Sequence, residues 1–477
     1  MTIHQNLIAG EWTGTNGTEN INPSDTNEVV GLYASASAQD VTDAIAAAKA
    51  AFPAWSRSGI LERHTIMKKA GDEILARKDE LGALLAREEG KTLPEAIGET
   101  IRAAQIFEFF AGEALRLAGE VLPSVRPNIG VEITREPLGV IGVITPWNFP
   151  IAIPAWKIAP ALCYGNTVVF KPADLVPGCS WAIVDILNRA GLPKGVLNLV
   201  MGKGSVVGQA MLDSPVLSGI TFTGSVGTGK RVALSSVEHG RKYQLEMGGK
   251  NPMVVLDDAD LTVAVEAAAN SAFFSTGQRC TASSRLIVTE GIHDRFVAAL
   301  TEKLKTLNVD NAMKSGTHIG PVVDAKQLKT DTDYIEIGKR EGAKLAFGGE
   351  LVSRDTPGFY LQPTLFTEAT NQMRISREEI FGPVASVIRV RDYEEALATA
   401  NDTPFGLSSG IATTSLKHAT HFKRNAEAGM VMVNLPTAGV DFHVPFGGRK
   451  GSSFGSREQG KYAAEFFTTV KTAYTLA

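Results

Sequence analysis

The sequence has few cysteines and no excess of charge of one sign. Its 477 residues include three cysteines, Cys163, Cys179 and Cys280. That count is odd and too small for a disulfide framework, and it is typical of a reducing compartment. Lysine plus arginine number 47 and aspartate plus glutamate 51, which gives a net charge of −4. We therefore expect no nucleic-acid or membrane partner, although a local basic pocket is compatible with this balance.

The chain also has little that resembles a targeting or membrane segment. Residues 1–10 contain no basic stretch followed by an apolar core, so they do not match a secretory signal. Residues 137–156 carry no charge over a membrane-like length, but four prolines would interrupt a helix there. We expect a buried strand that ends in a loop, in a cytoplasmic protein.

Hydrophobic periodicity divides the chain into regions. Apolar residues recur every three to four positions over 41–55 and again over 60–89, which predicts helices. The charged residues of 60–89 are expected to form a solvated face. From residue 140 onward, short apolar runs alternate with helical segments, which is typical of parallel sheets covered on both sides. The runs lie at 140–145, 167–170, 196–200 and 220–223, and then at 253–256, 286–289, 385–390 and 430–434.

The two sets of runs predict two α/β domains with a boundary near Gly248-Gly249. At about 150 residues per domain, the length of the chain alone would suggest three domains. Two further alternating strands, Val131–Pro137 and Phe466–Tyr474, lie outside both sets. Isolated strands of this kind can pair into an arm, and its exposed edge would attract another subunit.

Cys280 is the candidate nucleophile. It lies in the polar loop STGQRCTA directly after Arg279, and a neighbouring cation lowers a thiol pKa and favours the reactive thiolate. Cys163 and Cys179 lie in apolar or ordinary contexts and are expected to pack. Glu246, in QLEMGGKNP, lies where burial can raise its pKa into the range of a general base. Taken alone, it is better explained as a surface glutamate beside a turn.

Three other segments can carry chemistry. Asn148, in PWNFP, follows a predicted strand, where a rigid amide can donate to a developing oxyanion; taken alone, such an asparagine is more often a turn residue. The glycine-rich segment Gly224–Lys230 opens a helix, where backbone amides can approach a phosphate. Lys171 and Asp174 end another strand, where an acidic side chain can accept hydrogen bonds from ribose hydroxyls. His418 and His421 form an isolated H-x-x-H, so we predict no metal site.

Taken together, the motifs closely resemble the aldehyde dehydrogenase superfamily over nearly the whole chain. They are PWNFP, VVFKPAD, FTGS with Gly229, QLEMGGKNP, GQRCT, EEIFGPV and PFGG, in that order. The resemblance implies two doubly wound α/β domains plus a small β oligomerisation arm, in a homodimer or homotetramer. It assigns NAD(P) binding to 1–117 and 138–247, catalysis to 248–448, and the arm to 118–137 and 449–477.

The resemblance also implies the roles of individual residues. Cys280 would be the nucleophile that forms a thiohemiacetal and then a thioester, Asn148 the oxyanion donor, and Glu246 the base that activates water. NAD is the favoured cofactor, with NADP as the alternative, because Asp174 is shorter than the glutamate of NAD-preferring relatives. The positions that correspond to cofactor contacts are Pro146, Trp147, Lys171, Asp174, Gly204, Gly224, Ser225, Gly229, Glu379 and Phe381.

The substrate is predicted from departures within the family. The succinate semialdehyde branch carries an arginine where this chain has Trp156, so that carboxylate anchor is absent. Arg279 can replace it or can form a structural ion pair, and the sequence leaves both open. Trp156 and Phe446 are the other predicted substrate contacts. The segment Lys450–Glu458 is one residue longer than the family pattern K-x-S-G-x-G-R-E, so the resemblance does not define that part of the pocket.

The segments PIAIPAWK, GQRCTA and SREQG most resemble the branch that acts on 2,5-dioxopentanoate, also called α-ketoglutarate semialdehyde. We therefore predict a small carboxylated semialdehyde as substrate. The alternatives are succinate semialdehyde, a broad range of aliphatic aldehydes, and, more remotely, a non-catalytic binding or structural role. A thiol hydrolase would need a histidine partner for Cys280, and no histidine lies in the motifs.

Overall fold

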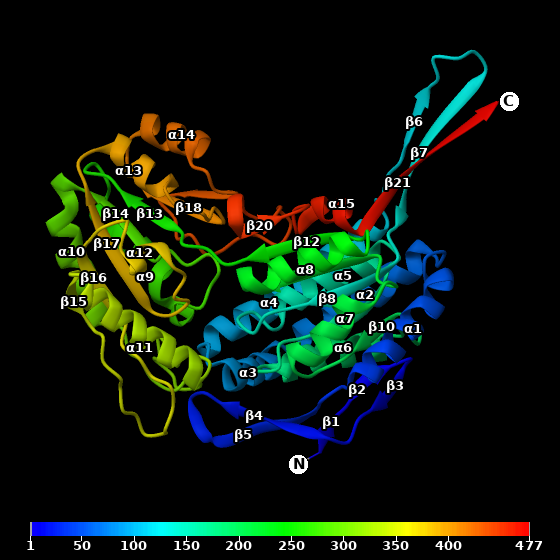
Figure 1. Cartoon of the computed structure of the whole chain (residues 1–477), viewed down its shortest axis with the longest axis horizontal. Helices are drawn as coiled ribbons and strands as arrows, with labels where there is room; N and C mark the ends of the chain where they lie inside the picture. The colour runs from blue at the N-terminus through cyan, green and yellow to red at the C-terminus, as the bar shows by residue number, and fades with distance from the viewer. Residues whose placement is uncertain (1, 477) are drawn as a thin grey trace.

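Two large sheets form the centres of two lobes (Figure 1). The structure is a computed structural model that describes residues 2–476. The strand order is β20-β12-β11-β8-β9-β10-β2-β3 in the first sheet and β15-β16-β17-β14-β13-β18-β19 in the second. The helices between the short apolar strands cover both faces of such sheets, so the strands are buried.

The first sheet has a parallel centre with antiparallel strands at both edges. The parallel strands are β8 (Val140–Ile144), β9 (Thr167–Lys171), β10 (Leu197–Leu199), β11 (Gly219–Gly224) and β12 (Lys242–Met247). The edge strands are β2 (Asn6–Ile8), β3 (Glu11–Thr13) and β20 (Ser453–Phe454). The helices are α1 (Ala38–Trp55), α2 (Ile60–Ala76), α3 (Lys78–Glu89), α4 (Leu93–Ala114), α5 (Ala152–Cys163), α6 (Pro177–Arg189), α7 (Gln209–Asp213) and α8 (Val226–Glu238).

The second sheet is parallel except for the edge strand β15. Its strands are β13 (Pro252–Val255), β14 (Arg285–Thr289), β15 (Lys344–Phe347), β16 (Thr364–Ala369), β17 (Val384–Val390), β18 (Ser408–Ala412) and β19 (Met430–Val433). Its helices are α9 (Leu261–Phe273), α10 (Glu290–Lys305), α11 (Ala325–Arg340), α12 (Arg374–Arg377), α13 (Tyr393–Asn401) and α14 (Leu416–Asn425). The chain passes from the first sheet to the second between β12 and β13.

Two small sheets complete the fold. One contains β1 (Ile3–His4), β4 (Gly17–Asn22) and β5 (Asp25–Ala34). The other is a projecting arm made of β6 (Glu120–Pro123), β7 (Ile129–Pro137) and β21 (Thr468–Leu476) (Figure 1). The antiparallel pairing of β21 with β7 confirms that the two isolated strands of the sequence pair with each other.

The C-terminal segment differs from the expectation that it belongs to the arm from residue 449. Strand β20 instead pairs with β12 of the first sheet. The short helix α15 (Ala464–Phe467) buries Phe466 and Phe467 in the core of the first lobe. Their large apolar surface favours burial over an exposed arm position. In this segment only β21 belongs to the sheet of the arm.

The helical stretch Ile60–Glu89 also differs from expectation in two ways. It is divided into α2 and α3 at Arg77. The prediction that its charged residues are solvated is wrong for Arg63, Glu88 and Glu89, which are 7%, 1% and 0% exposed. Arg63 donates to three backbone carbonyls near the end of α1, and Glu88 accepts from two backbone amides at the start of α6. Backbone partners therefore compensate the burial of Arg63 and Glu88.

The apolar stretch 137–156 contains the expected buried strand, β8, followed by a loop. The helix α5 then begins at Ala152, with Pro154 in its first turn, where a proline costs little. Among residues 2–476, no helix has the length and apolar character needed to cross a membrane.

Candidate active site

A cavity lies at the carboxyl ends of β8, β11 and β12, where the loop that carries Cys280 approaches from the second lobe. The carboxyl ends of parallel strands are the usual place for a ligand in such folds. Most of the residues singled out in the sequence are brought together here. Those that line the cavity are Pro146, Trp147, Asn148, Trp156, Gly224, Ser225, Glu246, Cys280, Glu379, Phe381 and Phe446.

Four of the predicted cofactor residues lie outside this cavity. Lys171 ends β9, beside β8, and its Nζ donates to the carbonyl of Pro172 at 2.6 Å. Asp174 lies exposed just beyond it. Gly204 begins the turn that leads to α7. At Gly229 in α8, a Cβ would lie 2.4 Å from a side-chain sulfur of β12, so glycine is what lets α8 approach the sheet.

The loop before Cys280 is a sharp turn with an unusual backbone. Ser275, Thr276 and Gly277 have φ values of 49°, 57° and 68°, in the left-handed region that costs a residue with a Cβ about 1–2 kcal/mol. Glu95 of α4 accepts hydrogen bonds from the Ser275 amide and hydroxyl, at 2.9 and 3.0 Å. The hydroxyl of Thr276 donates to a backbone carbonyl at 3.1 Å. These contacts compensate the strain and fix the position of Cys280.

The environment of Cys280 favours the neutral thiol. Burial, and then the negative charges of Glu246, Glu379 and Glu458, raise the pKa of Cys280 to about 12. The expectation that Arg279 lowers this pKa is therefore wrong for the protein without ligands, because desolvation disfavours the thiolate more than any nearby cation favours it.

Glu246 lies on β12 and is 2% exposed. Burial, and then the charge of Glu458, raises the pKa of Glu246 well above its usual range, and a hydrogen bond from the Ser453 hydroxyl opposes that shift. Glu458 itself forms a buried ion pair with Lys157. A raised pKa suits a carboxylate that must take a proton near neutral pH.

The sequence analysis missed Lys157, Ser453 and Glu458. Ser453 and Glu458 come from the segment Lys450–Glu458, whose extra residue left this part of the pocket undefined. Lys157 lies in α5, where its surroundings resemble those of an apolar core position. The extra residue was the available signal, because it marks a segment that departs from the family pattern.

Asn148 connects the two lobes. Its Nδ2 donates to the carbonyl oxygen of Gln278 at 2.9 Å, and its own backbone carbonyl accepts from Lys91 Nζ at 2.7 Å. An amide nitrogen has two hydrogens, so one remains for an oxyanion in the cavity.

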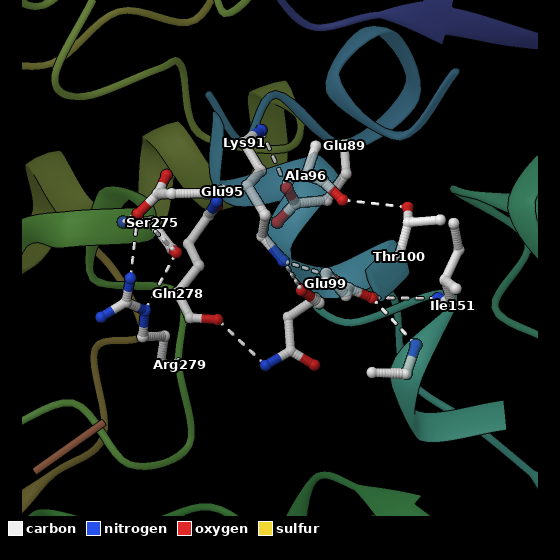
Figure 2. Close-up of polar contacts among 12 residues, drawn as sticks. Glu89, Lys91, Glu95, Ala96, Glu99, Thr100, Ile151, Ser275, Gln278 and Arg279 are labelled. Atoms are coloured by element: carbon white, nitrogen blue, oxygen red, sulfur yellow. Dashed lines mark hydrogen bonds and ion pairs between the residues drawn. The ribbon is translucent and has the colours of Figure 1, made fainter. Parts of the chain in front are cut away.

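Glu99 of α4 fixes the loop that carries Asn148. Figure 2 shows its carboxylate between Lys91 and the backbone amide of Ile151. Lys91 Nζ and the amides of Ile151 and Ala152 donate to this carboxylate at 2.6, 3.0 and 3.1 Å. Lys91 and Glu99 have side chains that are 1% and 2% exposed. The amides at the start of α5 have no partners within the helix, so the carboxylate satisfies them and also balances the lysine charge.

Glu95, one turn earlier on α4, also binds Arg279, which in turn bonds to Ser275 of the same loop. Arg279 Nη2 donates to Glu95 at 2.9 Å and Arg279 Nε to the Ser275 hydroxyl at 2.9 Å (Figure 2). Arg279 Nη1 lies 3.3 Å from Asn270 Oδ1. Of the two roles that the sequence leaves open for Arg279, the structure contains the ion pair.

The opposite end of the cavity fits a dinucleotide. The turn Gly224-Ser225 leads from β11 into α8, where free backbone amides favour a phosphate. The rings of Trp147 and Phe381 meet edge to face at 5.3 Å, and Phe381 has a φ of 64°. Glu379 accepts from a backbone amide at 2.9 Å, and a Cβ on Gly248 would lie 2.0 Å from its carboxylate. Glycine at position 248 therefore leaves room for the Glu379 carboxylate at the wall of the cavity.

His418 and His421 both contact Tyr393. The ring of His418 stacks on it at 4.5 Å, and His421 Nδ1 lies 2.7 Å from its hydroxyl. Within the described range 2–476, no group of three or more histidine, cysteine or acidic side chains is placed to bind a metal ion.

The sequence and the structure were both compared with those of known proteins, and the comparisons agree with one another. Residues 12–473 match the sequence model of the aldehyde dehydrogenase family. The chain is 46% identical over 474 residues to the alpha-ketoglutaric semialdehyde dehydrogenase of Bacillus subtilis, covering 98% of this chain and 97% of the relative. It is 41% identical over 472 residues to the 2,5-dioxopentanoate dehydrogenase of Saccharolobus solfataricus, covering 98% of each. A crystal structure of betaine aldehyde dehydrogenase from Staphylococcus aureus in complex with NAD+ superposes with a TM-score of 0.96 at 33% identity, covering 99% of this chain and 95% of that one.

Replacing Glu99 by glutamine tests the contact network of α4. The substitution removes the carboxylate that pairs directly with the buried Lys91, so we expect the free energy of unfolding in urea to fall by about 3 kcal/mol. Glu108→Gln, on the same helix but 48% exposed, is the matched control and should change it by less than about 0.5 kcal/mol. Equal effects of the two substitutions would contradict a special role for Glu99.

The pH dependence of alkylation tests the environment of Cys280. Iodoacetamide reacts with the thiolate, and a raised pKa makes the thiolate scarce at neutral pH, so the rate should climb with pH without a plateau near neutrality. Glu246→Gln removes one of the charges that raise this pKa, so its profile should shift to lower pH. Asp174→Asn, at an exposed position outside the cavity, should leave the profile unchanged. Mass spectrometry identifies the modified cysteine.

Proposed function

Because the chain belongs to the aldehyde dehydrogenase family, we propose that it oxidises a small carboxylated aldehyde to the corresponding acid, with NAD as the hydride acceptor. The observation that carries this proposal is the single cavity lined by Cys280, Asn148 and Glu246. A nucleophile, an oxyanion donor and a base are the three groups that such an oxidation requires of the protein.

Cys280 begins the reaction. Its thiol releases a proton to solvent, its sulfur forms a bond to the aldehyde carbon, and the carbonyl electron pair moves to the oxygen, which becomes an oxyanion. The hydrogen of Asn148 Nδ2 that is not bonded to Gln278 can donate to this oxygen. The contacts of Glu95 and Glu99 keep the two loops in place, so little reorganisation is needed when the charge develops.

The second half of the reaction releases the acid. The tetrahedral carbon gives up a hydride, which the nicotinamide accepts when the cofactor is bound, and a thioester remains on Cys280. Glu246 then removes a proton from a water molecule that attacks the thioester, and the thiol is restored as the carboxylic acid leaves. Glu246 is the base in this scheme because it lines the same cavity and has a raised pKa.

The proposed cofactor is NAD, with NADP as the alternative. Lys171 and Asp174 lie at the end of β9, beside the strand that leads to Asn148. The exposed carboxylate of Asp174 would repel a 2′-phosphate and could accept hydrogen bonds from ribose hydroxyls. The S. aureus enzyme that shares the fold was crystallised with NAD+.

The proposed substrate is 2,5-dioxopentanoate or a close relative of it. Proteins named for oxidation of α-ketoglutarate semialdehyde or 2,5-dioxopentanoate match 98% of the chain at 46% and 41% identity. A plant succinate-semialdehyde dehydrogenase matches at 38%, so succinate semialdehyde is the less favoured substrate.

We also propose that the arm joins subunits into a homodimer or homotetramer in the cytoplasm. Strand β21 exposes Val470, Tyr474 and Leu476, at 56%, 62% and 74%. Exposed apolar side chains beside a sheet edge mark a surface for association. The cysteines at all three positions are free, as suits a reducing compartment.

A panel of aldehydes tests the proposed activity. With NAD and 2,5-dioxopentanoate, absorbance of the reduced cofactor should rise, and Cys280→Ala should lower the rate by about 10³-fold or more. Cys163→Ala, at a buried cysteine outside the cavity, is the control and should keep the activity. Absence of reduced cofactor with every aldehyde, with either NAD or NADP, would refute the proposal.

The double substitution Val470→Asp and Tyr474→Asp tests the arm. Charges at an apolar subunit contact carry a large desolvation cost, so light scattering should show a loss of the oligomer and a mass near the 50.8 kDa of one chain. Leu416→Asp, at an 80% exposed position on α14, controls for the added charge and should leave the mass unchanged.

A further inference from the structure

A second cavity adjoins the one that contains Glu246. The two cavities share Trp156, Cys280 and Phe446. An aldehyde whose carbon is bonded to the Cys280 sulfur can therefore extend its remaining atoms into the second cavity while the first holds the cofactor. Three cations line this second cavity, namely Lys91, Arg102 and Arg279.

Two of these cations already have carboxylate partners. Lys91 pairs with Glu99 at 2.6 Å, and Arg279 pairs with Glu95 at 2.9 Å. Each nitrogen of the Arg279 guanidinium has a protein acceptor. A substrate carboxylate would have to displace one of these contacts to bind either side chain. Breaking the buried pair of Lys91 and Glu99 is costly, and the pair of Arg279 and Glu95 is itself mostly shielded from solvent.

Arg102 differs from both. Within residues 2–476, no carboxylate lies within ion-pair distance of it, and its only hydrogen bond runs from Nη2 to Gln459 Oε1, at 3.0 Å. Its Nε is buried without a partner in that range. The guanidinium lies over the ring of Trp156, 5.6 Å from the centroid. The contact with Trp156 and the bond to Gln459 orient the guanidinium and leave donors for a ligand.

The carboxylates near Arg102 do not serve as its ion-pair partner. Burial lowers the pKa of Arg102, and the charges of Glu99 and Asp441 oppose this shift. Glu99 is occupied by Lys91 and two backbone amides, and Asp441 is exposed to solvent. A partly desolvated cation with free donors is best satisfied by an anion that arrives with the substrate.

We propose that Arg102 binds the carboxylate of the substrate in the second cavity and so selects carboxylated aldehydes over neutral ones. This inference rests on the proposed aldehyde oxidation and names the residue that sets its substrate class. It assigns the carboxylate to Arg102, whereas Arg279 positions the Cys280 loop. The sequence around Cys280 predicts neither role. Arg279 is adjacent to Cys280, whereas Arg102 is 178 residues away from it (280 minus 102).

The decisive experiment compares 2,5-dioxopentanoate with pentanal, which has the same chain length and no carboxylate. Arg102→Gln should lower kcat/KM for 2,5-dioxopentanoate by about 10- to 100-fold, mainly through KM, because hydrogen bonds to a charged group are lost. The value for pentanal should stay the same. Arg102→Lys keeps the charge and should restore part of the loss.

Arg279→Gln is the matched control. Because Arg279 acts through the loop of Cys280, this substitution should lower kcat for both aldehydes by the same factor. If Arg279→Gln abolishes the preference for the carboxylated aldehyde, or if Arg102→Gln slows both substrates equally, the assignment to Arg102 is wrong. If the unsubstituted protein oxidises neither aldehyde, the proposed function itself fails, and this result is distinct from the other two.

Two further measurements do not depend on turnover. Binding of 2-oxoglutarate, the acid expected from 2,5-dioxopentanoate, should weaken by about 10- to 100-fold in Arg102→Gln when measured by calorimetry. Asp441→Asn removes a negative charge that attracts the same guanidinium, so it should lower the KM for 2,5-dioxopentanoate. Unchanged 2-oxoglutarate binding in a folded Arg102→Gln protein would overturn the proposal.

Discussion

Two carboxylates on one face of α4, the buried Glu99 and the partly buried Glu95, determine the geometry of the proposed site. Glu95 accepts from the Ser275 backbone and from Arg279 in the second lobe, and Glu99 accepts from the first amides of α5 beside Asn148. Cys280 and Asn148, the proposed nucleophile and oxyanion donor, come from different lobes, so their relative position depends on the helix that both loops contact. Asn148 adds a direct link through its bond to the carbonyl of Gln278.

The energies involved are consistent with this role. Left-handed φ values at Ser275 and Thr276 together cost about 2–4 kcal/mol, on the basis of about 1–2 kcal/mol for each residue with a Cβ. A hydrogen bond to a charged group contributes about 1.5–3 kcal/mol, and Glu95 accepts two from Ser275. The carboxylate can therefore offset the strain of the turn that presents Cys280.

Local patterns in the sequence predict much of this fold and part of the site. Apolar runs separated by helices indicate both sheets, and the polar loop around Cys280 indicates the nucleophile. Lys91, Glu95, Glu99 and Arg102 could not be assigned, because their partners are distant in the sequence. Glu95 bonds Ser275 180 residues further along the chain, and Glu99 bonds Ile151 52 residues further along. Charges at 95, 99 and 102 on one face of a helix rich in alanine were the available signal.

The account is tested most directly by a double-mutant cycle between Glu99→Gln and Asn148→Ala, measured as the single-turnover rate of cofactor reduction. If Glu99 acts by placing Asn148, the loss caused by Asn148→Ala will be much smaller in the Glu99→Gln background, with a coupling energy of about 1–3 kcal/mol. Additive losses, with a coupling energy near zero, would show that the position of Asn148 does not depend on Glu99 and would contradict the account.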